Sequence, residues 1–175
     1  MSPLQDVVIL AVPWDHPDSI HLRILQRNEI ASLGGVEPGI APSAADVSVF
    51  LVAYCDGTPV GCGGLRPLAG STSDAAEIKR MFVDTAYRGP LDLPKGSGKS
   101  LAELILGRLE DEALQRGWSL LLLETGIFLA KARRFYERCG FIQRDMFGDY
   151  TAADNSVCYE KRLDPSRRAS TVSQS

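Results

Sequence analysis

A segment rich in glycine and lysine, Lys95-Gly96-Ser97-Gly98-Lys99-Ser100, carries the residue types best suited to binding a ligand. It leads directly into residues 98–116, in which apolar side chains recur at helical spacing. Glycine lets the backbone approach a ligand closely, and the start of a helix presents unpaired N–H groups at the positive end of the helix dipole. Lys95 and Lys99 add positive charge. The segment therefore predicts a site for a phosphate or pyrophosphate group.

A nucleotide-binding P-loop is the competing interpretation of this segment. Gly98-Lys99-Ser100 resembles the end of a P-loop, and the apolar residues 120–123 are followed by the acid Glu124. The pattern G-x-x-x-x-G-K-[ST] requires a glycine where this chain has Leu93. A P-loop also follows an early parallel strand directly, whereas a β-meander is predicted here. A nucleotide enzyme is therefore only a remote alternative.

Apolar periodicity and turn residues predict a mixed α+β domain around this segment. Asp56-Gly57-Thr58-Pro59 separates two β-rich stretches and predicts a hairpin. The predicted strands cover residues 7–12, 47–55, 60–66, 75–83, 118–123, 141–147 and 157–163, and the predicted helices cover residues 17–33, 98–116 and 128–139. This order predicts an α+β or mixed α/β fold with a largely antiparallel sheet rather than a doubly wound fold.

The composition limits the class of protein. The chain has 175 residues, of which 45% are hydrophobic and 23% are charged, as in one ordinary globular domain. Its net charge of -3 disfavours a nucleic-acid-binding protein, because such proteins neutralise phosphates with Lys and Arg. The apolar run at residues 120–123 is too short to cross a membrane, and residues 1–6 lack the features of a secretion signal. We therefore expect a cytoplasmic protein that binds neither nucleic acid nor a membrane.

The cysteines and histidines do not form a metal-binding pattern. The four cysteines lack a Cys-x-x-Cys pair, and neither His16 nor His21 has a partner at a useful spacing. We therefore expect reduced, buried thiols and no metal site. Residues 165–175 are rich in Ser, Arg and Ala, which predicts a disordered tail after a single domain over residues 1–164.

Residues 95–100 are similar to the Q/R-x-x-G-x-G/A pyrophosphate signature of the GNAT N-acetyltransferase superfamily. Lys95 takes the first position, and Ser100 stands where Gly or Ala is usual. Further segments resemble the family in the same order along the chain: residues 77–83 and 87–89 upstream, and residues 123–126, 132–141 and 159–161 downstream. The resemblance spans residues 49–163 and implies the GNAT acyl-CoA N-acyltransferase fold, in which the central strands of a largely antiparallel sheet splay apart between flanking helices.

One departure from the family leaves the start of the glycine loop open. Family members usually run from the fourth strand into this loop through a short Arg-Gly segment. In this chain Pro90-Leu91-Asp92-Leu93-Pro94 intervenes, so either Arg88-Gly89 or Lys95-Gly96 matches that segment. We choose Lys95-Gly96, because it adjoins the helix that must carry the dipole.

The resemblance implies direct attack of a primary amine on the thioester of acetyl-CoA, without an acyl-enzyme. Removing a proton at pH 7 from an amine of pKa about 10.4 costs about 4–5 kcal/mol. For the thiol leaving group, of pKa about 8.5, the free-energy difference between the protonated and ionised forms at pH 7 is only about 2 kcal/mol. Deprotonating the amine is therefore more costly than protonating the leaving thiolate, so the enzyme mainly needs a base. Glu77 is the first candidate, acting directly or through water, because the resemblance places its strand beside the thioester. Glu124 and a water chain are the alternatives.

The resemblance also implies roles in binding the co-substrate. Tyr136 matches the family's tyrosine that faces the coenzyme sulfur, and we expect it to hydrogen-bond the developing thiolate. Period-two alternation predicts that Glu77, Lys79, Met81 and Val83 share one face of their strand. The implied cofactor-binding residues are the pantetheine contacts Met81, Phe82 and Val83, through their backbone groups, and the pyrophosphate contacts Lys95, Gly96, Ser97, Gly98, Lys99 and Ser100.

The acceptor is framed in such enzymes by the N-terminal helix and nearby loops, here residues 20–40 and 147–155. Four acidic residues in these segments would attract a cationic amine: Glu29, Glu37, Asp149 and Asp154. We expect a small-molecule amine or an amino acid rather than a protein substrate. A coenzyme A-binding module that has lost catalysis is the alternative function. The oligomeric state stays open, a homodimer included.

Overall fold

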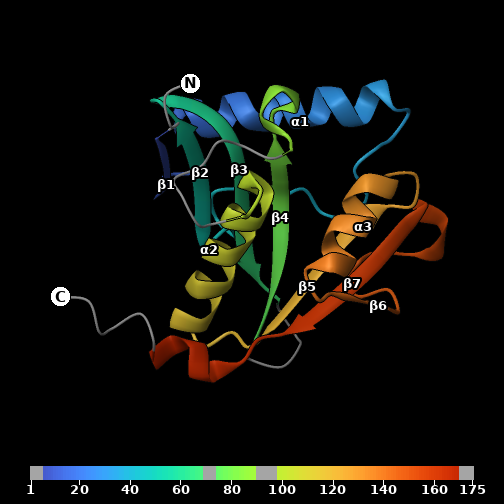
Figure 1. The fold of residues 1–175 in the computed structure, drawn as a ribbon. Helices are drawn as coiled ribbons and strands as arrows, with labels where there is room; N and C mark the ends of the chain where they lie inside the picture. The colour runs from blue at the N-terminus through green and yellow to red at the C-terminus, as the bar shows by residue number, and fades with distance from the viewer. Residues whose placement is uncertain (1–5, 69–73, 90–97, 170–175) are drawn as a thin grey trace.

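The computed structural model describes residues 6–68, 74–89 and 98–169, which form one sheet with helices on both of its faces (Figure 1). The predicted order of strands and helices is confirmed, although the sixth strand is shorter than expected. The elements are β1 (Val7–Ala11), α1 (Pro17–Ser32), β2 (Val49–Cys55), β3 (Thr58–Pro67), β4 (Ala75–Val83), α2 (Leu101–Gln115), β5 (Leu120–Gly126), α3 (Ala130–Arg138), β6 (Ile142–Arg144) and β7 (Ser156–Arg162). Three short 3-10 helices, η1 (Thr85–Tyr87), η2 (Ala152–Asp154) and η3 (Pro165–Ala169), join or follow them.

The sheet is mixed and largely antiparallel, as predicted. Its strand order is β1-β2-β3-β4-β5-β7-β6, and β4 with β5 is the parallel pair. That pair is short, because only Ala75–Glu77 of β4 lie opposite Leu120–Leu122 of β5. Beyond Glu77 the two strands diverge, as Figure 1 shows. This divergence is the central splay of the GNAT acyl-CoA N-acyltransferase fold that the resemblance implied.

Helices cover both faces of the sheet. On one face, α2 and α3 bury a core that includes Ile105 and Leu109 of α2. The helix α2 comes close to β3 because Gly63 has no side chain, since a Cβ at that position would lie 2.9 Å from Leu109 Cδ1. On the other face, Leu22 of α1 packs with Phe50 and other residues of the second cluster. The splay therefore opens between α2 and α3 on one side and α1 on the other.

A β-bulge in β4 corrects one expectation from the sequence. Gly63 lies opposite two residues of β4 instead of one, and Arg80 adopts a left-handed φ of 59°. The extra residue reverses the alternation of side chains. Lys79 stays on the α1 face with Glu77, but Met81 packs against the α2 core with Val83. The prediction that all four side chains share one face is therefore wrong.

The C-terminal segment continues beyond the predicted domain end at residue 164. Residues 165–169 form η3, and Arg167 pairs with Glu110 of α2 at 2.6 Å and with Asp111 at 3.4 Å. Residues 170–175 of the predicted tail lie outside the described residues. Within the described ranges, no helix is long and apolar enough to cross a membrane.

Candidate active site

The predicted pyrophosphate loop is described from Gly98 onward, and Lys95, Gly96 and Ser97 lie outside the described residues. Gly98 has a φ of 54°, a left-handed conformation that favours glycine, and Lys99 is exposed. Ser100 is the N-cap of α2, where it forms a capping box with Glu103. The helix therefore begins at Leu101, three residues after the predicted start at residue 98.

The capping box limits what Ser100 offers an anion. The Glu103 carboxylate accepts hydrogen bonds from the Ser100 amide at 2.7 Å and from its hydroxyl at 2.8 Å. These bonds, from the backbone first and the side chain second, lower the pKa of Glu103, so the carboxylate is ionised at neutral pH. A phosphate contact by Ser100 would have to compete with Glu103. Gly98 and Lys99 carry no such competing contact among the described residues.

Arg88, the alternative first residue of the pyrophosphate loop, binds α1 and the end of β4. Its guanidinium forms a bidentate pair with Glu29 of α1, with N–O distances of 2.8 and 2.6 Å. Its Nε donates to the Val83 carbonyl at 2.7 Å. Arg88 therefore holds α1 against the end of β4.

The edge of β4 that faces the splay presents backbone groups of Met81 and Val83. The Met81 carbonyl accepts a hydrogen bond from Gln26 Nε2 at 3.0 Å, and Val83 accepts its bond from Arg88. Phe82 lies opposite Cys62 and points its backbone toward β3, because backbone direction alternates along a strand. Of the three predicted pantetheine contacts, the geometry thus leaves Met81 and Val83 but not Phe82.

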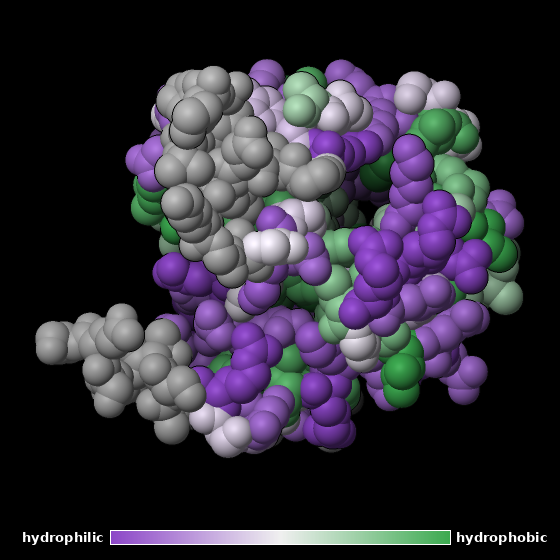
Figure 2. Space-filling view, viewed as in Figure 1, coloured by the Kyte–Doolittle hydropathy of each residue, from purple (hydrophilic) through white to green (hydrophobic). Residues whose placement is uncertain are grey.

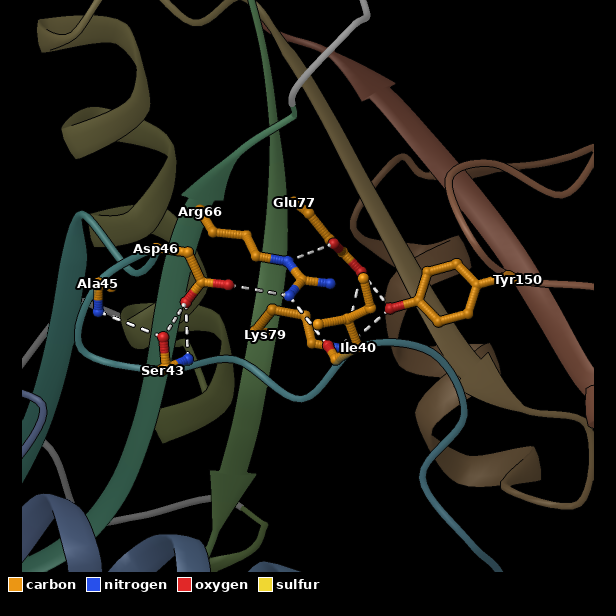
Figure 3. A network of polar contacts seen from close by, with 8 residues as sticks. All are labelled: Ile40, Ser43, Ala45, Asp46, Arg66, Glu77, Lys79 and Tyr150. Atoms are coloured by element: carbon orange, nitrogen blue, oxygen red, sulfur yellow. Dashed lines mark hydrogen bonds and ion pairs between the residues drawn. The ribbon is translucent and has the colours of Figure 1, made fainter.

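Glu77 lies at the point of divergence, in a buried polar network (Figure 3). Its side chain is 1% exposed. Arg66 Nε donates to Glu77 Oε2 at 2.9 Å, and the Tyr150 hydroxyl donates to Oε1. Lys79 Nζ donates to the Tyr150 hydroxyl at 2.9 Å and lies 3.7 Å from Glu77 Oε1. Both oxygens of the leading candidate base are therefore already hydrogen-bonded.

Arg66 and Tyr150 are the site residues that the sequence did not reveal. Arg66 lies opposite Glu77 in the β3–β4 pair, and it also contacts the Ile40 carbonyl and Asp46. Its position follows from the hairpin register, which the sequence left open. Tyr150 belongs to residues 147–155, which were predicted only to frame the acceptor. Burial raises the pKa of Tyr150, so its hydroxyl is neutral and keeps its proton for Glu77.

Glu124 and Tyr136 lie on the other side of the splay. Glu124 is on β5 and accepts a hydrogen bond from the Ser156 hydroxyl. Burial raises its pKa, and its charge interacts with Lys79 and Glu77 across the gap. Tyr136 is buried on α3, and burial raises its pKa, with the charge of nearby Glu124 contributing. The structure therefore brings both predicted catalytic residues and the alternative base around one opening.

The surface is hollowed at this opening. Figure 2 shows a hollow between β4 and α3, below α1 in that view. Within the described residues, no group of three or more His, Cys, Asp or Glu side chains is arranged to hold a metal ion. The reactive side chains near the opening include carboxylates, phenols and the amine of Lys79, and burial is the main cause that lowers the pKa of this amine.

Comparisons with known proteins identify the family. The GNAT acetyltransferase domain model matches residues 46–143. The IAA acetyltransferase of Azospirillum brasilense is 39% identical over 163 residues, which are 93% of this chain and 94% of that protein. The structure of a Klebsiella pneumoniae protein assigned as an acyl-CoA N-acyltransferase is 29% identical, with a TM-score of 0.70, and the match covers 90% of this chain and 98% of that one.

A more distant structure shares the fold. PaiA N-acetyltransferase of Thermoplasma acidophilum, solved in complex with coenzyme A, is 17% identical, with a TM-score of 0.63 over 90% of this chain and 99% of that one. The chain belongs to the GNAT family of N-acetyltransferases.

Proposed function

We propose that this protein transfers the acetyl group of acetyl-CoA directly to the primary amine of a small molecule or an amino acid. The observation that carries the proposal is the divergence of β4 and β5 after Glu77. It leaves the edge of β4 at Met81 and Val83 without a paired strand among the described residues, beside the half-buried Glu124 and the buried Tyr136. The coenzyme A complex of the Thermoplasma protein supports the choice of co-substrate.

The residues around the splay fit acetyl-CoA. The edge of β4 at Met81 and Val83 has no paired strand in the described part of the chain, and an N–H group there can bond to an extended amide-containing chain such as pantetheine. The two carbonyls already accept bonds from Gln26 and Arg88. The start of α2, with Gly98 and Lys99, would hold the pyrophosphate together with the preceding loop residues 95–97. When bound, acetyl-CoA supplies an activated thioester. The protein then needs only to position the amine, accept its proton and stabilise the thiolate.

Glu124 is better placed than Glu77 to accept that proton. Both Glu77 oxygens hold hydrogen bonds, one of them in an ion pair with Arg66. Glu124 Oε1 accepts a bond from Ser156, and Oε2 has no partner among the described residues. Burial raises the Glu124 pKa, and each unit of increase makes proton transfer from the amine about 1.4 kcal/mol less unfavourable. We therefore assign Glu124, directly or through water, as the base and Glu77 as a positioning residue for Lys79 and Tyr150.

Tyr136 stabilises the leaving thiolate by donating a hydrogen bond. An ordinary phenol of pKa about 10 would give its proton to a thiolate of pKa about 8.5 uphill by about 2 kcal/mol. Burial raises the pKa of Tyr136 further, so complete proton transfer is still less favourable. A neutral hydroxyl that keeps its proton is suited to a hydrogen bond that strengthens as negative charge develops on sulfur.

Thiol release from acetyl-CoA over a panel of amines, amino acids and peptides tests the function. We expect acceptor-dependent release, with an acetylated amine identified by mass spectrometry. Calorimetry with acetyl-CoA and with ATP runs in parallel. If acetyl-CoA binds but no acceptor accelerates thiol release, the chain is a coenzyme A-binding module without catalysis. If ATP binds and acetyl-CoA does not, the assignment of the glycine loop is wrong.

A further inference from the structure

Two buried polar atoms beside the proposed active site have no hydrogen-bond partner in the part of the chain that the structure describes. They are Arg80 Nε and Gln26 Oε1. The Arg80 side chain is 7% exposed, so its Nε has lost most of its contact with bulk water. Buried polar atoms are nearly always hydrogen-bonded in folded proteins, because an unpaired group has lost its hydration without compensation. A ligand that pairs with both atoms would account for them.

The Arg80 guanidinium has one edge in use and one edge open. Its Nη1 forms an ion pair with Glu37, in the segment that joins α1 to β2. On the other edge, formed by Nε and Nη2, the buried Nε has no hydrogen-bond partner among the described residues. This side-on edge presents two parallel N–H groups whose spacing matches the two oxygens of a carboxylate. The unpaired donor therefore favours an anionic, planar partner.

The backbone of Arg80 is held in a conformation that arginine seldom adopts. Its φ of 59° lies in the left-handed region, at a bulge position that usually takes glycine. Backbone strain of this kind clusters at functional sites, where it fixes the direction of a side chain. Here it directs the arginine toward α1 and Glu37.

Neighbouring cations are already committed to other partners. Arg23 donates to the carbonyls of Ser19 and Trp14 and lies 3.6 Å over the Trp14 ring. Lys79 donates to Tyr150. The charges of Arg23 and Lys79 interact with that of Arg80, while Glu77 offsets part of the charge of Lys79 and Glu37 pairs with Arg80 itself. Of these three cations, Arg80 is the one with an unpaired buried donor among the described residues.

Gln26 supplies the opposite polarity next to Arg80. Its Nε2 donates to the carbonyl of Met81, the residue that follows Arg80. A carbonyl can only accept, so this bond establishes which end of the amide is nitrogen and leaves Oε1 as the unpaired acceptor. Met81 also lies on the strand edge proposed to face the thioester. An N–H group that pairs with Gln26 Oε1 would therefore lie close to the reacting carbonyl.

We propose that the acceptor is an amine that also carries a carboxylate, such as an amino acid, bound through its carboxylate to the Nε–Nη2 edge of Arg80 and through its amine to Gln26 Oε1. This inference rests on the proposed acetyltransferase function and narrows its substrate class. The Gln26 contact uses one N–H of the neutral amine and leaves the nitrogen lone pair for the thioester. The Arg80 contact supplies the binding energy that selects the acceptor.

Paired acceptors test the proposal directly. For the twenty common amino acids, β-alanine and γ-aminobutyrate, the wild-type kcat/KM for acetyl transfer is compared with that of the matching carboxamide and of the amine without the carboxyl group. We expect the best carboxylate to exceed its carboxamide by on the order of 10- to 100-fold, the range for hydrogen bonds between charged groups. Equal rates for carboxylates and carboxamides would overturn the inference and leave the acetyltransferase function intact.

Two substitutions of Arg80 locate the selectivity. Arg80→Lys keeps the charge but removes the side-on fork, and Arg80→Asn removes the charge with a residue that tolerates a left-handed φ. We expect both to lower the rate with the carboxylate more than the rate with the carboxamide, so that the ratio of the two rates falls. Arg23→Lys is the matched control, because the donors of Arg23 bond to backbone carbonyls, and it should preserve the ratio.

The ratio of the rates with the carboxylate and with the carboxamide distinguishes a loss of acceptor binding from general damage to the fold. General damage to the fold lowers both rates together, so a ratio that survives in both Arg80 variants overturns the inference. If an Arg80 variant does not fold, the wild-type preference alone decides. If the wild-type protein binds acetyl-CoA but acetylates no amine of either kind, the proposed function itself fails, and the inference fails with it.

Discussion

The Tyr150 hydroxyl joins Glu77 and Lys79 in the interior of the protein. It donates to Glu77 Oε1 and accepts from Lys79 Nζ at 2.9 Å. The two charged side chains are 1% and 14% exposed, so water has little access to replace the hydroxyl. Tyr150→Phe removes this link and keeps the aromatic ring. The substitution therefore measures how strongly the buried network stabilises the fold.

The structure allows an estimate of the loss. Hydrogen bonds to charged groups contribute about 1.5–3 kcal/mol each, which gives roughly 3–6 kcal/mol for the two bonds of Tyr150. Part of the lost stabilisation is recovered in the variant, because Lys79 Nζ is 3.7 Å from Glu77 Oε1 and needs to move only slightly to pair with it directly. We expect a net loss of about 3 kcal/mol in the free energy of unfolding. For a domain of this size that lowers Tm by roughly 6–12 °C.

Tyr159→Phe is the matched control. The Tyr159 hydroxyl also bonds to a carboxylate and a cation, Glu137 at 2.8 Å and Arg133 at 3.2 Å. Those partners lie nearer the surface, where water can replace the lost bonds, so we expect a smaller loss. Calorimetry and urea denaturation of both variants measure the difference. An equal loss in the two would refute the view that the Glu77 network depends on Tyr150.

Two further predictions concern the proposed chemistry. Tyr136→Phe should lower kcat by up to about 100-fold and leave KM for acetyl-CoA unchanged, and an unchanged kcat in steady-state kinetics would remove its assigned role. Glu124→Gln should lower kcat by about 100-fold or more and abolish the acidic limb of the pH–rate profile, whereas an intact limb would exclude Glu124 as the base. Because burial raises the pKa of Glu124 above its ordinary value near 4.5, its favourable contribution to stability is present below that value and is lost as the pH rises through the folded-state pKa. Urea denaturation at several pH values should therefore show wild-type stability declining relative to Glu124→Gln over that rise, and parallel curves would contradict the shift.

Local chemistry in the sequence determined the elements and their ends. Asp56 and Gly57 both have positive φ, at 49° and 80°, as a two-residue hairpin turn requires. Gly117 and Gly140, with φ of 80° and 90°, stand just past the ends of α2 and α3. These features depend on neighbours within a few residues, so periodicity and turn preferences suffice to predict them. The family motifs likewise placed Glu77, Tyr136 and the start of α2 around one site.

The tertiary structure decided which side chains of β4 face the site. The bulge at Arg80 arises from the pairing of β4 with β3, and it moved Met81 and Val83 to the face opposite Glu77. No alternation pattern contains that information, because one extra residue reverses every side chain after it.

The partners of the buried groups are also beyond local patterns. Tyr150 reaches Glu77 across 73 residues of chain, and Gln26 reaches Met81 across 55. Contacts between such distant residues depend on how the sheet twists, where α1 docks and which loops fold over the splay. The sequence by itself thus determined the family and the strands and helices that carry Glu77, Glu124 and Tyr136. The fold alone decided that Glu77 is tied to Arg66 and Tyr150, and that Arg80 keeps a buried donor for a ligand, because both follow from burial and strand register.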